Sequence, residues 1–160
     1  MLPPEWTQSF QMKAQDLKHG DTWKLEYDEN IEPKNPNIDW KEYIRNTSAR
    51  FKCSVCRRQW PSNRVMVIFH MCLRNGQGTV KVRLLRQNCK MCSDAPMENP
   101  RVDSDNINIL MEKLVEKIKQ KCYYENLDEV NRQFKSLEVK SPHEPKHCEG
   151  CIKGVCTNNQ

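Results

Sequence analysis

The chain has 160 residues, of which 37% are hydrophobic and 29% are charged, so its apolar core is thin for its length. It contains no run of about 20 apolar residues, and we therefore expect no membrane-spanning helix in it. Its nine cysteines are an odd number, and neither a basic nor an apolar targeting stretch opens the chain. These features favour a reducing, cytoplasmic compartment and metal binding over a framework of disulfides.

The N-terminal part of the chain predicts a helix, a strand and a second short helix. Apolar residues recur at helical spacing over residues 4–17, and residues 22–28 alternate between apolar and polar side chains. The spacing of Trp40, Tyr43 and Ile44 favours the second helix. We expect the aromatic side chains of these elements to pack in the core.

Two Cys-x-x-Cys pairs organise the middle of the chain. They are Cys53/Cys56 and Cys89/Cys92, and 32 residues separate them. One such pair alone is also typical of a redox motif. Two pairs supply the four thiolates that a tetrahedral zinc ion needs, and four thiolates leave no open position for a water. The sequence therefore predicts a closed, structural zinc site.

The segment between these pairs has the pattern of a β-hairpin. A β-branched, apolar run occupies residues 65–71, a turn follows at 74–78, and residues 79–86 alternate. In the last run, apolar residues face one way while Lys81 and Arg83 face the other. We therefore expect an α+β fold, in which zinc-ribbon-like antiparallel β-hairpins surround a structural zinc and helices flank them.

Asp103 or Ser104 is suited to cap a helix over residues 105–124. The stripe that we expect to face the core consists of Ile107, Leu110, Met111, Leu114, Ile118 and Cys122. The face that we expect to be solvated consists of Glu112, Lys113, Glu116, Lys117 and Lys119. Residues 125–142 are polar and predict a partly mobile segment.

A third cluster lies near the end of the chain. Its preferred ligands for a second zinc are His143, Cys148, Cys151 and Cys156. His70 is an alternative source of a histidine ligand, so the sequence allows one zinc or two. We predict a single zinc-binding domain over residues 1–160, with a core of 5–124 that holds the first zinc and a second cluster at 143–156.

The letters His143-Glu144-Pro145-Lys146-His147 match the H-E-x-x-H pattern of zinc proteases. That mechanism needs a helix that sets both histidines on one face, and proline inside a helix costs about 3 kcal/mol. The pattern of zinc deaminases is also incomplete, since no H-x-E precedes the cysteine pairs. We therefore expect no enzymatic activity.

The formal charge of +5 is unevenly distributed. Residues 50–90 contain ten Lys or Arg and no Asp or Glu. Such a block is either a solvated face or a surface for RNA phosphates, which supply most of the non-specific affinity of RNA-binding proteins. The predicted contacts are Arg57, Arg58, Lys81 and Arg83, with Trp60 stacking on unpaired bases.

The motifs together resemble those of a known family. They are Phe51-Lys52-Cys53-Ser54-Val55-Cys56 with Trp60, Val80-Lys81-Val82-Arg83, Gln87-Asn88-Cys89-Lys90-Met91-Cys92, and His143 ahead of Cys148-Glu149-Gly150-Cys151 and Cys156. Over residues 5–156 the chain is similar to the receptor-transporting proteins, which carry three Cys-x-x-Cys zinc-finger pairs. The likeness is closest to the interferon-inducible member.

The resemblance implies two activities. One is a chaperone role that helps G-protein-coupled receptors reach the cell surface. The other is an antiviral role in innate immunity, through binding of viral RNA and viral replication proteins. The family usually carries a hydrophobic membrane anchor, which this sequence does not contain, so the resemblance implies a domain that faces the cytosol from such an anchor. The alternative is a receptor-trafficking module with no nucleic-acid role.

Overall fold

The computed structural model describes residues 2–17 and 19–124. The segment 125–142 and the predicted cluster at 143–156 lie outside the described residues, so the predictions made for them stay predictions. The elements are α1 (Pro4–Ala14), β1 (Thr22–Tyr27), β2 (Lys41–Lys52), β3 (Gln59–Arg74), β4 (Gln77–Leu84), β5 (Gln87–Asn88), β6 (Met97–Glu98) and α2 (Ser104–Cys122). Within the described residues, neither helix combines the length and the apolarity that a membrane span requires.

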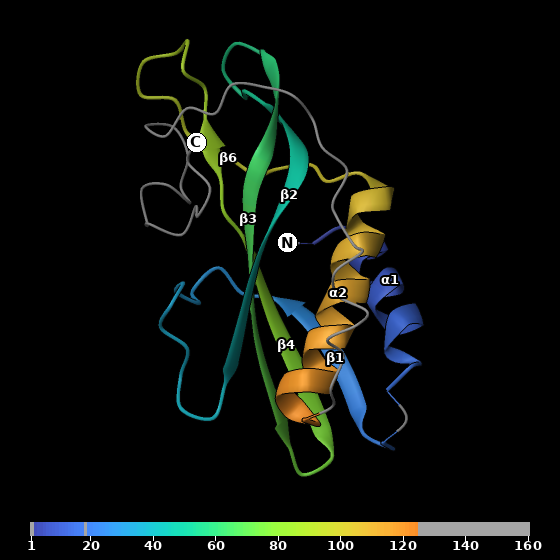
Figure 1. The fold of residues 1–160 in the computed structure, drawn as a ribbon. Helices are drawn as coiled ribbons and strands as arrows, with labels where there is room; N and C mark the ends of the chain where they lie inside the picture. The colour runs from blue at the N-terminus through green and yellow to red at the C-terminus, as the bar shows by residue number, and fades with distance from the viewer. Residues whose placement is uncertain (1, 18, 125–160) are drawn as a thin grey trace.

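Four strands form one sheet in the order β1-β4-β3-β2, and β5 and β6 form a small second sheet. Strands β2, β3 and β4 are antiparallel, as the hairpin pattern predicts, and β1 joins β4 in parallel. Both helices lie on one side of the large sheet (Figure 1). The two loops that carry the Cys-x-x-Cys pairs lie at the end of the molecule opposite to the β3–β4 turn (Figure 1).

The main core lies between the helices and the sheet. Its largest fully buried side chains include Trp6 and Phe10 of α1 and Phe69 of β3. The apolar stripe of α2 is fully buried apart from Cys122, which is partly buried. A smaller cluster lies on the other side of the sheet and contains Ile31, Met66, Ile68 and Leu85. The sheet is therefore buried on both faces over much of its area.

The prediction of a short helix around Trp40, Tyr43 and Ile44 is wrong, because Tyr43 and Ile44 belong to β2. The ring of Tyr43 stacks on Phe69 in the main core, with 5.8 Å between the centroids, whereas Ile44 packs against the smaller cluster. Since both faces of this strand meet apolar neighbours, its sequence lacks the alternation that marks a half-exposed strand.

The apolar stripe predicted for α2 is confirmed, and its polar face is partly buried. Lys113 is 3% exposed and Glu116 is 8% exposed, with 3.4 Å between Lys113 Nζ and the Glu116 carboxylate. Helix α2 packs along β2, where Lys117 Nζ lies 5.6 Å from the ring of Tyr43. The flank of the helix that was expected to face water therefore meets the sheet.

Candidate metal centre

The four cysteines of the first predicted site come together. The Sγ atoms of Cys53, Cys56, Cys89 and Cys92 all lie within 4.8 Å of one another. Cys53 Sγ is 3.9 Å from Cys92 Sγ, and Cys56 Sγ is 3.8 Å from Cys89 Sγ. A zinc ion with four Zn–S bonds of about 2.3 Å requires tetrahedral S–S edges of about 3.8 Å. The donor set and its spacing therefore fit zinc.

The first cysteine pair lies on a loop whose backbone amides donate hydrogen bonds to the sulfur of Cys53. The amides of Val55 and Cys56 donate to Cys53 Sγ at 3.3 and 3.4 Å. Arg57 then takes a left-handed conformation, with φ of 67°, and its amide donates to the Cys53 carbonyl at 3.0 Å. This tight turn brings Cys56 back beside Cys53, and the amide donors stabilise negative charge on Cys53. We call each such Cys-x-x-Cys loop a knuckle.

Glu98 ties the first knuckle to the second half of the site. Its carboxylate accepts hydrogen bonds from the backbone amide of Ser54 at 2.8 Å and from Ser54 Oγ at 2.7 Å. Glu98 lies in β6, which pairs with β5 directly before Cys89. Sequence reasoning missed this residue, since nothing local marks a lone glutamate as a partner for a loop 44 residues away.

Arg58 is a second supporting residue, and it stabilises a thiolate. Its Nε donates to Cys89 Sγ at 3.4 Å, and this contact with a cation is the main reason why the pKa of Cys89 is lowered to about 6. The hydrogen bond with Cys56, together with burial, raises the pKa of Cys92 to about 12. The cluster alone therefore favours a thiolate at Cys89 and a thiol at Cys92, and a bound divalent cation would favour the thiolate form of the ligands.

The alternative histidine ligand does not join this cluster. His70 lies in β3, is 4% exposed, and its Nε2 is 2.9 Å from the Glu42 carboxylate of the neighbouring strand. Within the described residues, four cysteines form the candidate site without it. The second predicted ligand set, His143, Cys148, Cys151 and Cys156, lies outside the described residues, so the number of zinc ions stays open.

The prediction that Lys81 and Arg83 project from an exposed basic face is wrong for Arg83, which is buried, while Lys81 is half-buried. Arg83 is 6% exposed, and its Nη1 donates to the Ile31 carbonyl at 2.9 Å. Lys81 Nζ lies 3.2 Å from the Asp28 carboxylate. The segment between β1 and β2 lies against this face of the sheet and supplies these acceptors (Figure 1).

Trp60 and Arg58 are also engaged within the protein. The ring of Trp60 stacks on Phe51 with 5.4 Å between centroids, and the Arg58 guanidinium carbon lies 4.6 Å from the Trp60 centroid. Trp60 Nε1 donates to Gln87 Oε1 at 2.9 Å. Of the five predicted RNA contacts, only Arg57 is exposed, while Arg58, Trp60 and Lys81 are half-buried and Arg83 is buried. The five residues therefore do not form one free surface, and their contact with RNA stays a prediction.

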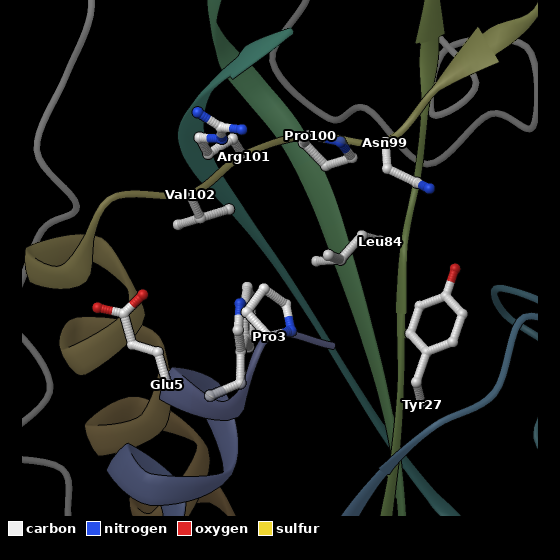
Figure 2. Close-up of a pocket in the computed structure, with 9 residues that line it drawn as sticks. Pro3, Glu5, Tyr27, Leu84, Asn99, Pro100, Arg101 and Val102 are labelled. Carbon is white, nitrogen blue, oxygen red and sulfur yellow. The ribbon is translucent and has the colours of Figure 1, made fainter. Parts of the chain in front are cut away.

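A separate cavity of about 400 Å³ lies beside the N-terminus of α1. It is lined by Pro3, Glu5, Trp6, Tyr27, Leu84 and residues 99–102. Figure 2 shows the segment from Asn99 to Val102 crossing above this cavity, with Arg101 beside β2. No thiol or histidine lines the cavity, so it is separate from the metal centre.

The chain resembles known proteins over nearly its whole length. Residues 46–154 match the family model of a zinc-binding domain, the zinc ribbon with three Cys-x-x-Cys pairs. The chain is 34% identical over 159 residues to receptor-transporting protein 3 of Mus musculus, which covers 97% of this chain and 34% of that protein. It is 30% identical over 154 residues to receptor-transporting protein 2 of Mus musculus, covering 94% of this chain and 69% of that protein. It is 32% identical over 155 residues to receptor-transporting protein 4 of Homo sapiens, covering 94% and 63%.

These identities are too similar to favour one member, including the interferon-inducible one. The chain spans from about a third to about two thirds of the length of these relatives. No solved structure is similar enough to count as a match. The four-cysteine cluster and the family match agree on zinc as the metal. The chain therefore belongs to the three-Cys-x-x-Cys zinc-ribbon family, and its homologues are the receptor-transporting proteins.

Proposed function

We propose that this chain is a non-enzymatic, zinc-stabilised interaction module that assists the transport of G-protein-coupled receptors to the cell surface. The names of its homologues support a role with receptors. The observation that carries the proposal is a pair of exposed apolar side chains on the knuckles. Val55 is 64% exposed and Met91 is 70% exposed, and each directly precedes the second cysteine of its pair.

The metal centre explains why such side chains are useful for binding a partner. Single exposed apolar residues are common, but Val55 and Met91 hold the same position in two knuckles that share one site. Both knuckles lie at one end of the molecule (Figure 1). A rigid loop presents its side chains without much loss of conformational entropy on binding, which strengthens the contact. We infer that these two side chains contact a receptor segment.

The test is to co-express a G-protein-coupled receptor with the wild-type chain, with the double variant Val55→Ser/Met91→Ser, or with Met12→Ser. Met12 is a matched control, because it is 69% exposed and lies on α1. We expect the double variant to lose most of the increase in surface receptor measured by flow cytometry, while Met12→Ser keeps it. A double variant that binds zinc normally and raises surface receptor as the wild type does would contradict the proposal.

A second candidate function is antiviral, through binding of viral RNA and viral replication proteins. The exposed cations Arg57 and Lys90, one on each knuckle, favour it, since phosphate contacts dominate RNA affinity. Salt separates the two candidates: RNA affinity falls steeply as salt rises, while an apolar receptor contact does not. Both candidates place this domain in the cytoplasm, facing the cytosolic side of a membrane when an anchor is attached.

A further inference from the structure

Strand pairing brings two arginines together beside the first knuckle. Arg50 of β2 and Arg101 form an antiparallel bridge, with the Arg50 amide donating to the Arg101 carbonyl at 2.9 Å and the reverse bond at 2.8 Å. Side chains of directly opposed residues project from the same face of a strand pair, and like charges in this position destabilise it. Both side chains are exposed. The pair therefore lowers stability unless an anion lies between the two guanidinium groups.

The register adds further donors to the same face. Lys52 pairs with Gln59 of β3, and continuing the Arg50–Arg101 register sets Lys52 across from Asn99. A cavity of about 210 Å³ opens here, and it is lined by Arg50, Phe51, Lys52, Gln59, Asn99 and Arg101. We call it the Arg50–Arg101 pocket.

All the charged side chains that line this pocket are positive. Three cations and two side-chain amides line it, and no carboxylate among the described residues does so. The adjacent acidic residue, Glu98, is held by two hydrogen bonds from Ser54 of the first knuckle. None of the three cations is a metal ligand, a support of the metal, or a residue of the exposed knuckle tips. The pocket therefore offers the positive charge and the hydrogen-bond donors that an oxyanion needs. Its three cations have no role in the metal centre.

We propose that the Arg50–Arg101 pocket binds a phosphate group on a compact ligand. Guanidinium groups bind phosphate oxygens in a bidentate manner, lysine adds a point charge, and amide NH₂ groups donate further hydrogen bonds. The donors converge from β2, β3 and the segment after β6 on one small cavity. A nucleic-acid chain would instead use cations spaced along a groove. The phosphate belongs either to a free small molecule or to a lipid headgroup.

The first experiment measures thermal unfolding of the zinc-loaded chain in inorganic pyrophosphate at constant ionic strength. We expect pyrophosphate to raise the melting temperature of the wild type, and Arg101→Gln to weaken pyrophosphate binding by about tenfold or more. Without pyrophosphate, Arg101→Gln should melt above the wild type, because the like-charge pair is gone. The backbone bonds of Arg101 do not depend on its side chain, so the variant should fold.

Two further variants make the result specific. Lys52→Gln removes a cation of the same pocket and should also weaken pyrophosphate binding. Arg74→Gln removes an exposed arginine at the end of β3, next to the distant turn, and should bind pyrophosphate as the wild type does. Equal stabilisation of wild type and Arg101→Gln by pyrophosphate would overturn the proposal. An equal loss in Arg74→Gln would also overturn it, since it would indicate an effect of net charge.

The second experiment identifies the source of the phosphate. Vesicles with a phosphatidylinositol bisphosphate are compared with phosphatidylserine vesicles of equal surface charge. Binding that prefers the inositol lipid, needs Arg101 and is displaced by pyrophosphate would assign a lipid headgroup. Arg101-dependent binding of pyrophosphate without vesicle binding would assign a free compact phosphate. Arg101-dependent binding of single-stranded RNA tighter than that of pyrophosphate would overturn the compact ligand and assign a nucleic-acid contact.

Discussion

Arg58 serves the metal centre and the core at once. Its Nε contacts the Cys89 sulfur, and its guanidinium covers the ring of Trp60. A planar, permanently charged group can stack and donate simultaneously, which lysine cannot do. The residue next to it, Arg57, is exposed and belongs to the knuckle turn. Two adjacent arginines therefore have different roles.

The first prediction concerns zinc retention in Arg58→Gln. The pKa of Cys89 is lowered from 9.0 to about 6, so the ionised thiol contributes stability that is fully present above pH 9 and is lost as the pH falls towards 6. Removing Arg58 raises this pKa, so zinc should dissociate at higher pH, with affinity near neutral pH lower by about tenfold. Competition with a chromophoric chelator across this pH range measures the shift. Arg57→Gln is the control, and an equal pH dependence in Arg58→Gln and the wild type would show that Arg58 does not tune the site.

The four cysteine ligands could be predicted from sequence because each pair is local and its spacing is set by zinc geometry. Glu98 could not, since it contacts Ser54 only after β6 has paired with β5. The sequence predicts an RNA contact for Arg58 because the residue follows the first knuckle closely, where the chain turns and long side chains usually project outward. Its inward direction depends on Cys89, which is distant in sequence, and on the ring of Trp60, which Phe51 and Gln87 hold in place.

At the level of elements, β1 is held to the sheet by a close contact. Gly78 of β4 pairs with Trp23 of β1, and a Cβ on Gly78 would lie 2.1 Å from Trp23 Cδ2. Trp23 Nε1 also donates to the hydroxyl of Tyr123, just after α2, at 3.1 Å. The indole is therefore fixed on two sides and cannot move aside freely. Because Gly78 has no Cβ, the Trp23 ring can lie against the backbone of β4 while β1 pairs with that strand.

The second prediction is that Gly78→Ala lowers the free energy of unfolding by about 1–3 kcal/mol, because overpacking forces Trp23 or the β1 backbone to shift. Chemical denaturation followed by circular dichroism measures the loss. Thr79→Ala, one position along β4, is the control and should cost less. Were Gly78→Ala as stable as the wild type, the close packing of Trp23 on β4 would have to be revised.

The elements differ in how far sequence could predict them. In the sequences of helix α2 and strand β4, apolar residues recur on one face and polar residues on the other. This periodicity is sufficient to predict a helix and a strand. Strand β2 has apolar neighbours on both faces at Tyr43 and Ile44, and its pattern resembled a helix. The parallel pairing of β1 with β4 is a non-local choice that no local pattern encodes. The burial of Arg83 likewise depends on a loop that is distant in sequence.

At the level of the whole molecule, the metal centre lies at one end and the helix-covered core at the other (Figure 1). The thin apolar core indicated by composition makes the metal an important part of the folding free energy.

The third prediction is that Cys89→Ser loses one zinc equivalent and melts at lower temperature, because a buried serine cannot replace a thiolate ligand. Native mass spectrometry and thermal unfolding measure both effects. Cys122→Ser, outside the cluster on α2, should keep its zinc, and full zinc content in Cys89→Ser would rule out the four-cysteine site.

The position of the β3–β4 turn relative to the metal has a topological consequence. Cys53/Cys56 precede this turn and Cys89/Cys92 follow it, so the metal closes a ring in the chain that has the exposed turn at its far end. A single cut at Asn75 would open the ring and divide the protein into two fragments, each with one knuckle. The first would keep strands β1, β2 and β3 of the large sheet, and the second would keep β4. Neither fragment would hold all four cysteines of this metal centre. Their reassembly would be switched by zinc, which makes the domain a natural template for a metal-controlled split protein.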